Sequence, residues 1–366
     1  MRFFDRTLCV YVLSGLLTAS AVAETEESDW TDRISFKGDF RLRYEEIDRE
    51  SRERRDRFRY RARLGLAAAV TSKVKVVMQI ASGADDPVSR NVTFDGGFTT
   101  KDIGFDLAYV DWTAADGLHV IGGKMKNPLF RAGGVPLIWD SDLNPEGVAA
   151  TYSNGMFFGT VAGFSVEERS EDSNSNFYAA QAGAKLAIGE RSTLTAGAGF
   201  FGYTNTIGNE PFFNGAPKGN TVFTDIDGTN SYIYDYKNTE VFAQFDTRIG
   251  EWPLRVYGHW TRNNEADDQD TAIAFGARIG KVKGKRTMEL SWTYQDIDAD
   301  AVIGTFNDSD FGGGGTDARG HIVKAKYALS KNIFLAGTYF SNVINRFSLP
   351  EEDYDRLQID LEFKFE

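Results

Sequence analysis

Hydrophobic and polar residues alternate strictly along several segments of the chain. Between residues 34 and 44, one face carries Ile34, Phe36, Gly38, Phe40, Leu42 and Tyr44, while the other carries Ser35, Lys37, Asp39, Arg41 and Arg43. Segments 57–70 and 354–365 repeat the pattern. Because successive side chains of a β-strand point to opposite faces, each segment is predicted to be a two-faced strand. A strand that crosses a bilayer needs about 9–11 residues, which these segments supply.

Sixteen such segments follow one another along the chain. We place them near 34–45, 57–70, 74–82, 103–113, 118–126, 147–153, 156–166, 177–188, 193–203, 239–249, 254–261, 271–279, 286–295, 320–329, 333–341 and 354–365. They predict an all-β fold, a transmembrane antiparallel β-barrel of about 16 strands.

The connections between these segments alternate in length. Short connections are expected at 71–73, 114–117, 153–155, 189–192, 250–253, 280–285 and 330–332, and long polar ones at 83–102, 127–146, 204–238 and 296–319. Short periplasmic turns, long extracellular loops and an even strand number are typical of outer-membrane barrels. A soluble β-sandwich is the alternative, but sixteen strands with alternating loop lengths are hard to fit into one. Aromatic residues near strand ends suit an interfacial girdle, namely Trp112, Trp252, Trp260, Trp292 and Phe365.

The N-terminal segment has the features of a secretory signal peptide. Arg2 and Arg6 precede a short apolar run, and Ala21-Val22-Ala23 forms a small-x-small cleavage site. We therefore expect residues 1–23 to be a signal peptide that is cleaved after Ala23. Residues 24–366 are expected to form a single barrel domain, located in the cell outer membrane.

Charge and cysteine content narrow the function further. The 366-residue chain has 41 basic and 53 acidic residues; removing residues 1–23 takes away two arginines and one aspartate, leaving 39 against 52, or -13. This acidity argues against a nucleic-acid partner. The single cysteine, Cys9, lies in the predicted signal, so no disulfide framework or thiolate metal site is expected in the mature chain.

The predicted inner face of the first two strands is built from arginines. A barrel of about 16 strands is too wide for side chains to fill and leaves an aqueous channel. Neighbouring strands lie about 4.8 Å apart, so six guanidinium groups would crowd one patch and need an acid or an anion nearby. The candidate basic wall of the pore comprises Arg41, Arg43, Arg57, Arg59, Arg61 and Arg63. A surface ladder on a soluble sheet is the alternative reading.

The long connection at 127–146 differs from the others. Its sequence, NPLFRAGGVPLIWDSDLNPE, is rich in apolar residues and proline. Exposed loops are usually polar, so we expect this loop to fold inward against the barrel wall. The candidate constriction-loop residues are Lys124, Lys126, Arg131, Asp140, Asp142 and Glu146.

The stretches GKMKNPLFRAGG (Gly123 to Gly134) and WDSDLNPEG (Trp139 to Gly147) resemble the Putative porin family of Gram-negative bacteria. The layout resembles the 16-stranded general diffusion porins. The resemblance implies that the third long loop folds into the lumen, that its acidic residues face a basic cluster on the opposite wall, and that the subunits form trimers. Barrels of this class usually end in an aromatic residue, whereas here Phe365 is followed by Glu366.

Several chemical motifs fail their structural context. Gly197 to Gly202 matches a dinucleotide fingerprint but lies within a predicted strand, with no helix after it. Asp296, Asp298 and Asp300 begin like a calcium loop whose positions six and twelve do not fit. The three histidines are widely separated. We therefore expect no enzyme, no catalytic residue, no metal and no cofactor.

The leading hypothesis is an outer-membrane porin, a passive diffusion channel for small hydrophilic solutes and ions. Its expected partners are outer-membrane lipid, lipopolysaccharide, those solutes and two further copies of the chain in a homotrimer. One alternative is a substrate-specific anion channel that uses the arginine ladder. A less favoured alternative is a barrel enzyme such as a phospholipase, which would need a serine–histidine pair at the lipid-facing rim. Saturating single-channel conductance would favour the specific channel, and lipid release the enzyme.

Overall fold

The computed structural model describes residues 30–347 and 350–365. Trp30–Arg33 form a single 3-10 turn, η1, in a unit separate from the one that begins at Ile34. The predicted signal peptide, 1–23, lies outside the described residues. Within the described ranges, no helix is both long enough and apolar enough to cross a membrane.

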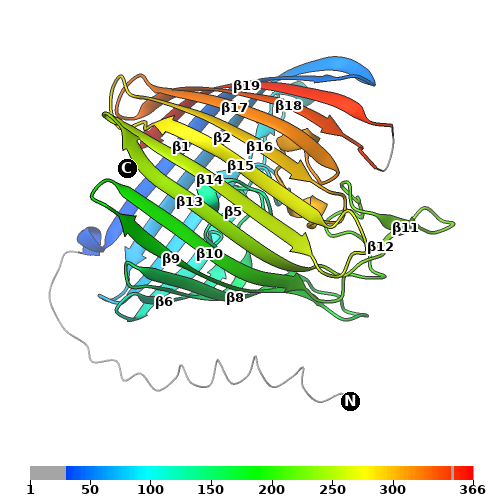
Figure 1. Ribbon diagram of the computed structural model, residues 1–366, viewed down its shortest axis with the longest axis horizontal. Coiled ribbons are helices and arrows are strands. Elements are labelled where there is room, and N and C mark those ends of the chain that lie inside the picture. Colours follow the sequence, from blue (N-terminus) through cyan, green and yellow to red (C-terminus); the bar gives the residue numbers. More distant parts are fainter. Residues whose placement is uncertain (1–29, 348–349, 366) are drawn as a thin grey trace, which may run out of the picture. The chain divides into compact units, whose positions relative to one another are not determined.

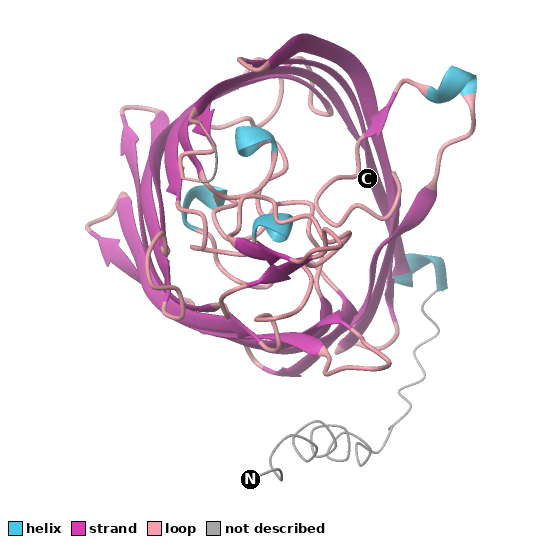
Figure 2. Cartoon of the chain, turned by 90° about the vertical axis from the view of Figure 1, so that its right-hand side faces the viewer, coloured by secondary structure: helices cyan, strands magenta, loops and turns pink. Residues whose placement is uncertain are grey.

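Sixteen long strands make a closed antiparallel barrel (Figures 1 and 2). Each pairs with the next one along the chain, and the first pairs with the last, with Arg43 opposite Asp360. The strands are β1 (Ile34–Arg49), β2 (Arg52–Ala69), β3 (Val74–Ser82), β5 (Ile103–Ala115), β6 (Leu118–Lys124), β7 (Glu146–Ser153), β8 (Phe157–Glu167), β9 (Ser175–Ile188), β10 (Ser192–Tyr203), β13 (Lys237–Ile249), β14 (Trp252–Asn263), β15 (Thr271–Gly280), β16 (Met288–Ile297), β17 (Ala318–Ala328), β18 (Ile333–Ile344) and β19 (Glu352–Phe365). Closure pairs every strand on both edges, which removes the exposed backbone groups that lipid cannot satisfy.

Three very short strands lie outside this ring of sixteen. β4 (Val92–Thr93) pairs with β2 beyond the end of β3. β11 (Val222–Thr224) and β12 (Asn230–Tyr232) form a separate hairpin at the long-loop end, seen at the right of Figure 1.

The sixteen predicted strands are confirmed, but the first two are longer than expected. β1 and β2 continue as a paired hairpin to a turn at 50–51, where the sequence pattern seemed to end at residue 45. Cross-strand ion pairs support the extension, with Arg57 2.5 Å from Glu45 and Arg54 3.4 Å from Glu46. Apolar alternation cannot reveal a strand region in which both faces are charged.

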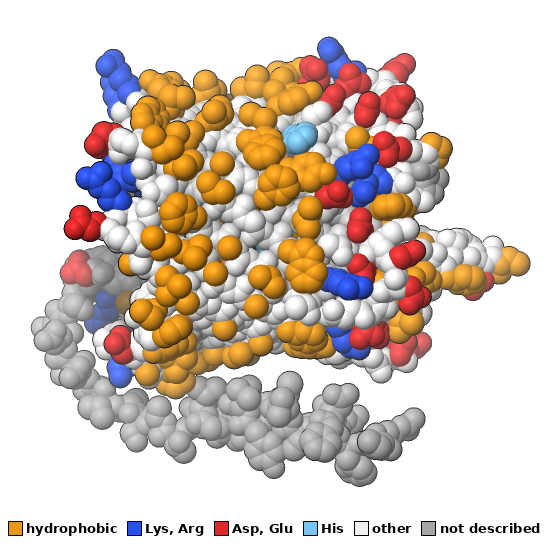
Figure 3. Space-filling model, in the orientation of Figure 1, with side chains coloured by type: hydrophobic (Ala, Val, Ile, Leu, Met, Phe, Trp, Pro, Cys, Tyr) orange, Lys and Arg blue, Asp and Glu red, His pale blue; other side chains and the backbone are white. Residues whose placement is uncertain are grey.

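The two faces of the barrel wall have opposite character. Outward positions are apolar and solvent-accessible, such as Phe36 (59%), Phe58 (56%) and Val241 (50%). Figure 3 shows this apolar surface across the strands, with charged side chains gathered toward the two ends. The same alternation turns the arginines of β1 and β2 inward, where they are mostly covered. This is the arrangement that a lipid-facing wall around a polar interior requires.

Loops fill much of the barrel interior, as the view along the barrel shows (Figure 2). One apolar cluster joins Val135 and Leu137 of the loop at 127–146, and Val302 and Phe311 of the loop at 298–317, to Phe242 on the wall. A second cluster joins Trp139, Phe212, Tyr232 and Ile303 to wall residues of β8, β9 and β10. The sequence pattern pointed to one inward loop, whereas segments of four long loops pack inside, because Val88 and Asn91 of the loop at 83–102 also contact the interior.

Lipid exposure predicts which substitutions the wall tolerates. Val323 lies in the middle of β17 and faces outward with 42% of its surface exposed, whereas its neighbour Lys324 lines an interior cavity. Val323→Arg should lower the free energy of unfolding by about 2–4 kcal/mol, because it places a charge in hydrocarbon. The control, Lys324→Arg, should change it little. Urea unfolding in lipid vesicles measures both, and equal effects of the two substitutions would contradict the assigned faces.

Candidate functional site: the charged inner wall

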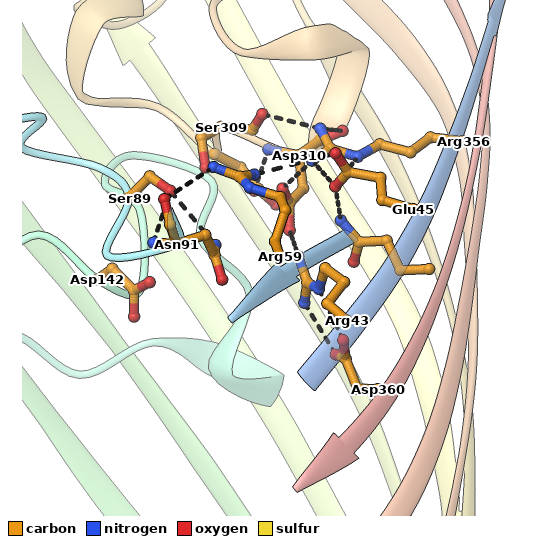
Figure 4. A network of polar contacts seen from close by, with 12 residues as sticks. Arg43, Glu45, Arg59, Ser89, Asn91, Asp142, Ser309, Asp310, Arg356 and Asp360 are labelled. Atoms are coloured by element: carbon orange, nitrogen blue, oxygen red, sulfur yellow. Dashed lines mark hydrogen bonds and ion pairs between the residues drawn. The ribbon is translucent and has the colours of Figure 1, made fainter. Parts of the chain in front are cut away.

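The inner wall of β1, β2 and β19 carries a network of ion pairs (Figure 4). Arg43 donates two hydrogen bonds to Asp360, of 2.7 and 2.9 Å, and lies 3.2 Å from Asp310. Arg356 contacts Glu45, and lies 2.7 Å from Asp310. Arg43, Glu45, Arg356 and Asp360 are nearly buried, with exposed fractions of 5% or less. Burying these charges is tolerable only because each is paired and hydrogen-bonded.

A second group of ion pairs joins the wall to the loop at 127–146. Arg61 lies 3.0 Å from Asp39 of β1 and 3.3 Å from Asp142 of the loop. Arg63 lies 2.8 Å from Asp39 and 3.7 Å from Asp142. The two arginines therefore hold this end of the loop against β2.

Arg41 and Arg59 are paired less well than their neighbours. The nearest carboxylate oxygens are 3.8 Å from Arg41, on Asp360, and 3.9 Å from Arg59, on Glu45. Both donate instead to Asn91 of the loop at 83–102, at 2.5 and 3.1 Å. Across the network, seven arginines (Arg41, Arg43, Arg57, Arg59, Arg61, Arg63 and Arg356) meet five carboxylates (Asp39, Glu45, Asp142, Asp310 and Asp360), which leaves an excess of two positive charges.

The other end of the loop at 127–146 is anchored across the barrel. The amide of Phe130 donates to Gln181 of β9, and that of Gly133 donates to Gln244 of β13, at 2.7 and 2.9 Å. Arg278 of β15 donates to the carbonyl of Gly133 at 2.8 Å. The loop therefore runs from the β9–β15 wall to the arginines of β2.

Gly133 is required where the loop meets the wall. Its φ is 64°, in the left-handed region, and a Cβ there would lie 2.5 Å from the ring of Tyr257. A side chain at this position would both strain the backbone and push the loop off the wall.

The loop at 298–317 lies over the loop at 127–146 and is bonded to it. The Asp140 amide donates to the carbonyl of Phe306 at 2.8 Å, and the Ser309 amide donates to the Asp140 carboxylate at 2.9 Å. Asn307 donates to the carbonyl of Leu137 at 3.0 Å. These bonds tie the two loops together inside the barrel.

Three aspartates between these loops have shifted pKa values. Burial, together with the charges of Asp308 and Asp142, raises the pKa of Asp140 well above its usual range. Burial and the neighbouring Asp310 raise the pKa of Asp308 to about 6. Burial would also raise the pKa of Asp310, but Arg356 and Arg43 outweigh it and hold that pKa far below its usual range. The carboxylate nearest the arginines therefore keeps its charge, and the other two are the first to take up protons.

A cavity of about 280 Å³ remains between the loops and the polar part of the wall. Its lining includes Arg41, Arg61 and Asp142, together with Lys324 of β17. In the described part of the chain, the Lys324 ammonium has no ion-pair partner. The wall side also carries hydroxyl and amide side chains, namely Ser291, Thr293, Thr338 and Gln358, beside Tyr257, Arg278, Ile322 and Phe340. The opposite side of the interior, along β8, β9 and β10, is occupied by the aromatic cluster.

Comparison with known proteins decides the family. A family model described as "Putative porin" matches residues 47–241 and 232–365. The chain belongs to this family of porins. Porins are non-enzymatic channels, and this barrel is an outer-membrane porin barrel.

Solved porin structures share the fold at low sequence identity. OprB of Pseudomonas putida, determined at high pH, matches with a TM-score of 0.61 and 11% identity, over 92% of this chain and 96% of that one. OmpF of Salmonella typhi, in complex with daunomycin, matches with a TM-score of 0.55 and 11% identity, over 91% and 97%. A trimer form of OmpT from Vibrio cholerae gives a TM-score of 0.51 and 14% identity, over 91% and 99%. No curated protein sequence matches.

The candidate constriction-loop residues have different surroundings in this porin. Asp142 pairs with Arg61 and Arg63, whereas Asp140 is buried between the two loops and, within the described ranges, pairs with no arginine of the wall. Arg131 donates weakly to Ser141 and to the carbonyl of Trp139, at 3.4 and 3.5 Å. Lys126 is exposed, and Arg63 and Lys37 are among the charges that act on it.

Lys124 and Glu146 require a correction. They pair with each other at 2.7 Å and line a depression with Phe105, Ile103 and Arg90, which no arginine of β1 or β2 lines. Glu146 lies two positions before Val148 on β7 and shares its outward face, so its side chain points away from the lumen. β7 begins at Glu146, one residue earlier than expected, and β6 ends at Lys124, so both residues belong to the wall and not to the inward loop.

The sequence interpretation missed the main partners of the arginines. Glu45, Arg356 and Asp360 come from strand positions that share the inward face, and Asp310 comes from the loop at 298–317. The alternation of segment 354–365 contained the signal for Arg356 and Asp360, because closing the barrel places the last strand beside the first. Nothing in the sequence marked Asp310, since its loop is polar and glycine-rich. In the ranges 30–347 and 350–365, no cluster of His, Cys, Asp and Glu side chains has the arrangement of a metal site.

The shifted pKa of Asp308 predicts how stability depends on pH. A carboxyl whose pKa is higher in the folded porin than in the unfolded chain binds protons preferentially in the folded state. The free energy of unfolding should therefore rise by about 1 kcal/mol between pH 7.5 and pH 5 through this group. Asp308→Asn should remove that part of the rise, and comparing both proteins by urea unfolding cancels the other titrating groups. Identical pH dependence in the two proteins would contradict the assignment.

Proposed function

We propose that this porin is a passive diffusion channel for small hydrophilic solutes and ions. The supporting observation is the loop at 127–146, which runs from the β9–β15 wall to Arg61 and Arg63 and leaves a polar cavity beside it. The aqueous path would follow this cavity along its residues of β1, β2 and β15–β19, because the aromatic cluster fills the side of β8, β9 and β10. The loop would then be the constriction, and the six arginines of β1 and β2 its basic wall.

The position of the charges favours a weak preference for anions. The mature chain is acidic, but exposed charges farther away than about 8–10 Å are screened at physiological salt. The network on the inner wall has two more arginines than carboxylates, and the Lys324 ammonium adds to it. Walls of low dielectric strengthen this field where the path is narrow. A substrate-specific anion channel is the second candidate, favoured by the weak pairing of Arg41 and Arg59.

The biogenesis and assembly of the porin belong to the same proposal. Residues 1–23 would direct export and be cleaved after Ala23, and the folded barrel would lie among outer-membrane lipid and lipopolysaccharide. The trimer form of the structurally similar OmpT supports a homotrimer. The outward apolar surface seen in Figure 3 suits both lipid and subunit contacts.

Replacing the constriction arginines tests the channel and its ion preference together. Arg59→Gln, Arg61→Gln and Arg63→Gln in one protein should shift the zero-current potential in a salt gradient toward cations. Carboxylates such as Asp39 and Asp142 would then stand without their partners beside the path. Planar bilayer recordings measure the potential, and conductance that saturates with one solute would favour the specific channel.

A charge-matched control carries glutamine at Arg191, Arg248 and Arg286, which are exposed at the short turns. It should leave the potential close to that of the unmodified porin. If the wall triple variant gives the same potential as this control, the three arginines do not line the path. A folded barrel that carries no current would refute the channel itself.

A further inference from the structure

This inference rests on the proposed channel function and concerns its long-loop mouth. A recess of about 420 Å³ lies between the β1–β2 hairpin, the loop at 298–317 and the adjoining ends of β18 and β19. Its floor includes Ile47, Ile344 and Tyr354, three partly or fully buried side chains of the barrel wall. Two of these belong to the apolar cluster inside the barrel, so the recess belongs to the lumen and not to the lipid-facing surface.

The recess is strongly basic. Six cationic side chains line it, namely Arg49, Arg52, Arg55, Arg57, Lys218 and Arg356, against one carboxylate, Glu53. Arg49 is paired with Glu352, and Arg57 and Arg356 are paired with Glu45. Among the described residues, no carboxylate lies within ion-pair distance of Arg52, Arg55 or Lys218. Three unpaired cations and one carboxylate leave an excess of two positive charges.

Lys218 is held in place by its backbone. Its φ of 49° is in the left-handed region, which costs a non-glycine residue free energy. Its carbonyl accepts a hydrogen bond from the Thr316 amide at 2.9 Å. A Cβ at Gly304 or Gly315 would lie 2.1 or 2.3 Å from that carbonyl oxygen, so the two glycines make room for it. The loops thus fix a lysine at the recess in a conformation that glycine would adopt more easily.

The hairpin on the other side of the recess is also fixed. Arg49 donates two hydrogen bonds to Glu352, of 2.8 and 2.7 Å, and the Ser51 amide donates to the same carboxylate at 2.9 Å. The Glu50 amide donates to the carbonyl of Asp353 at 3.2 Å. Arg52 and Arg55 are therefore carried on a hairpin tied to the start of β19, near the top of Figure 1. Because the backbone is already fixed, ligand binding has a smaller entropic cost.

The recess adjoins the rest of the arginine ladder. A second cavity, of about 340 Å³, shares Arg57, Lys218 and Arg356 with the recess and adds Arg59 to its lining. The inward arginines of β2 recur at every second position from Arg55 to Arg63, about 6.6–6.8 Å apart. An anion that leaves the recess thus meets the next guanidinium group within a short step toward the constriction.

We propose that this recess is a capture site for small oxyanions that carry two negative charges. Arg52, Arg55 and Lys218 neutralise the ligand, and Arg57 is the first group that receives it on the way inward. Guanidinium and ammonium groups bind such oxyanions through charge-assisted hydrogen bonds. A monovalent ion such as chloride satisfies only part of the excess charge and is held less well.

Equilibrium binding tests the site without relying on conduction. Inorganic phosphate at pH 8 serves as the probe, with dialysis against the folded, detergent-solubilised porin at low salt. The variant with Arg52→Gln, Arg55→Gln and Lys218→Gln should bind phosphate about tenfold more weakly or not detectably. The control with Arg54→Gln, Arg262→Gln and Arg319→Gln removes the same charge from solvent-accessible strand ends at the long-loop side, outside the recess. It should bind as the unmodified porin does.

Gel mobility with and without heating establishes that each variant is folded before it is tested. Equal weakening in the two triple variants, or no phosphate binding by the unmodified porin, would overturn the capture site. In bilayers, phosphate added on the long-loop side should reduce the chloride current, with a half-inhibitory concentration about tenfold higher for the recess variant. Phosphate binding without any current would refute the channel function but keep the site, whereas current without binding would do the reverse.

Discussion

The inside of this barrel depends on the neutralisation of a row of arginines that cannot face lipid. Alternation along β2 turns Arg57, Arg59, Arg61 and Arg63 to the same side, and crowding them there is unfavourable unless carboxylates approach. Asp39 and Glu45 of β1 and Asp142 of the loop at 127–146 pair with these arginines. Asp310 of the loop at 298–317 pairs with Arg43 and Arg356 beside them. Because the wall arginines need these carboxylates, they also fix the positions of two loops inside the barrel. The positions of the loops in turn determine the space that is left for solute.

Apolar packing completes what the ion pairs begin. The loop at 127–146 carries its hydrophobic residues into two apolar clusters, one along β8–β10 and one that reaches wall residues of β13–β19, and it carries its Asp142 to the arginines. It therefore separates the aromatic cluster on β8–β10 from the polar cavity beside β1 and β2. Asp140 and Asp308 are held between the loops, and among the described residues neither forms an ion pair with an arginine; burial and neighbouring carboxylates raise their pKa values. The excess positive charge stays on the polar side, at Arg41, Arg59, Lys324 and the mouth.

The repetitive part of this structure was predictable, and the loop contacts were only partly so. Period-two alternation and loop length identified sixteen strands, because the outward residues of a lipid-facing wall must be apolar at every second position. The pattern failed where both faces are charged, as in the hairpin tip beyond Glu45, and where a strand begins with a charged residue before the apolar alternation, as at Glu146. The pairing of Asp142 with the arginines was expected from the resemblance to porins, in which acidic residues of the inward loop face a basic wall. The pairing of Asp310 could not be predicted, because contacts between distant polar loops leave no periodic signal.

The central claim is that water and solute follow the polar half of the interior. The one cysteine, Cys9, lies in segment 1–23, so single cysteines can be placed in the barrel and modified during recording. A charged methanethiosulfonate reagent should change the single-channel current at once when the cysteine replaces Ser291 or Lys324, which line the polar cavity. It should leave the current unchanged when the cysteine replaces Ala179, which is buried in the aromatic cluster. Rapid modification at Ala179, with none at Ser291 or Lys324, would contradict the account.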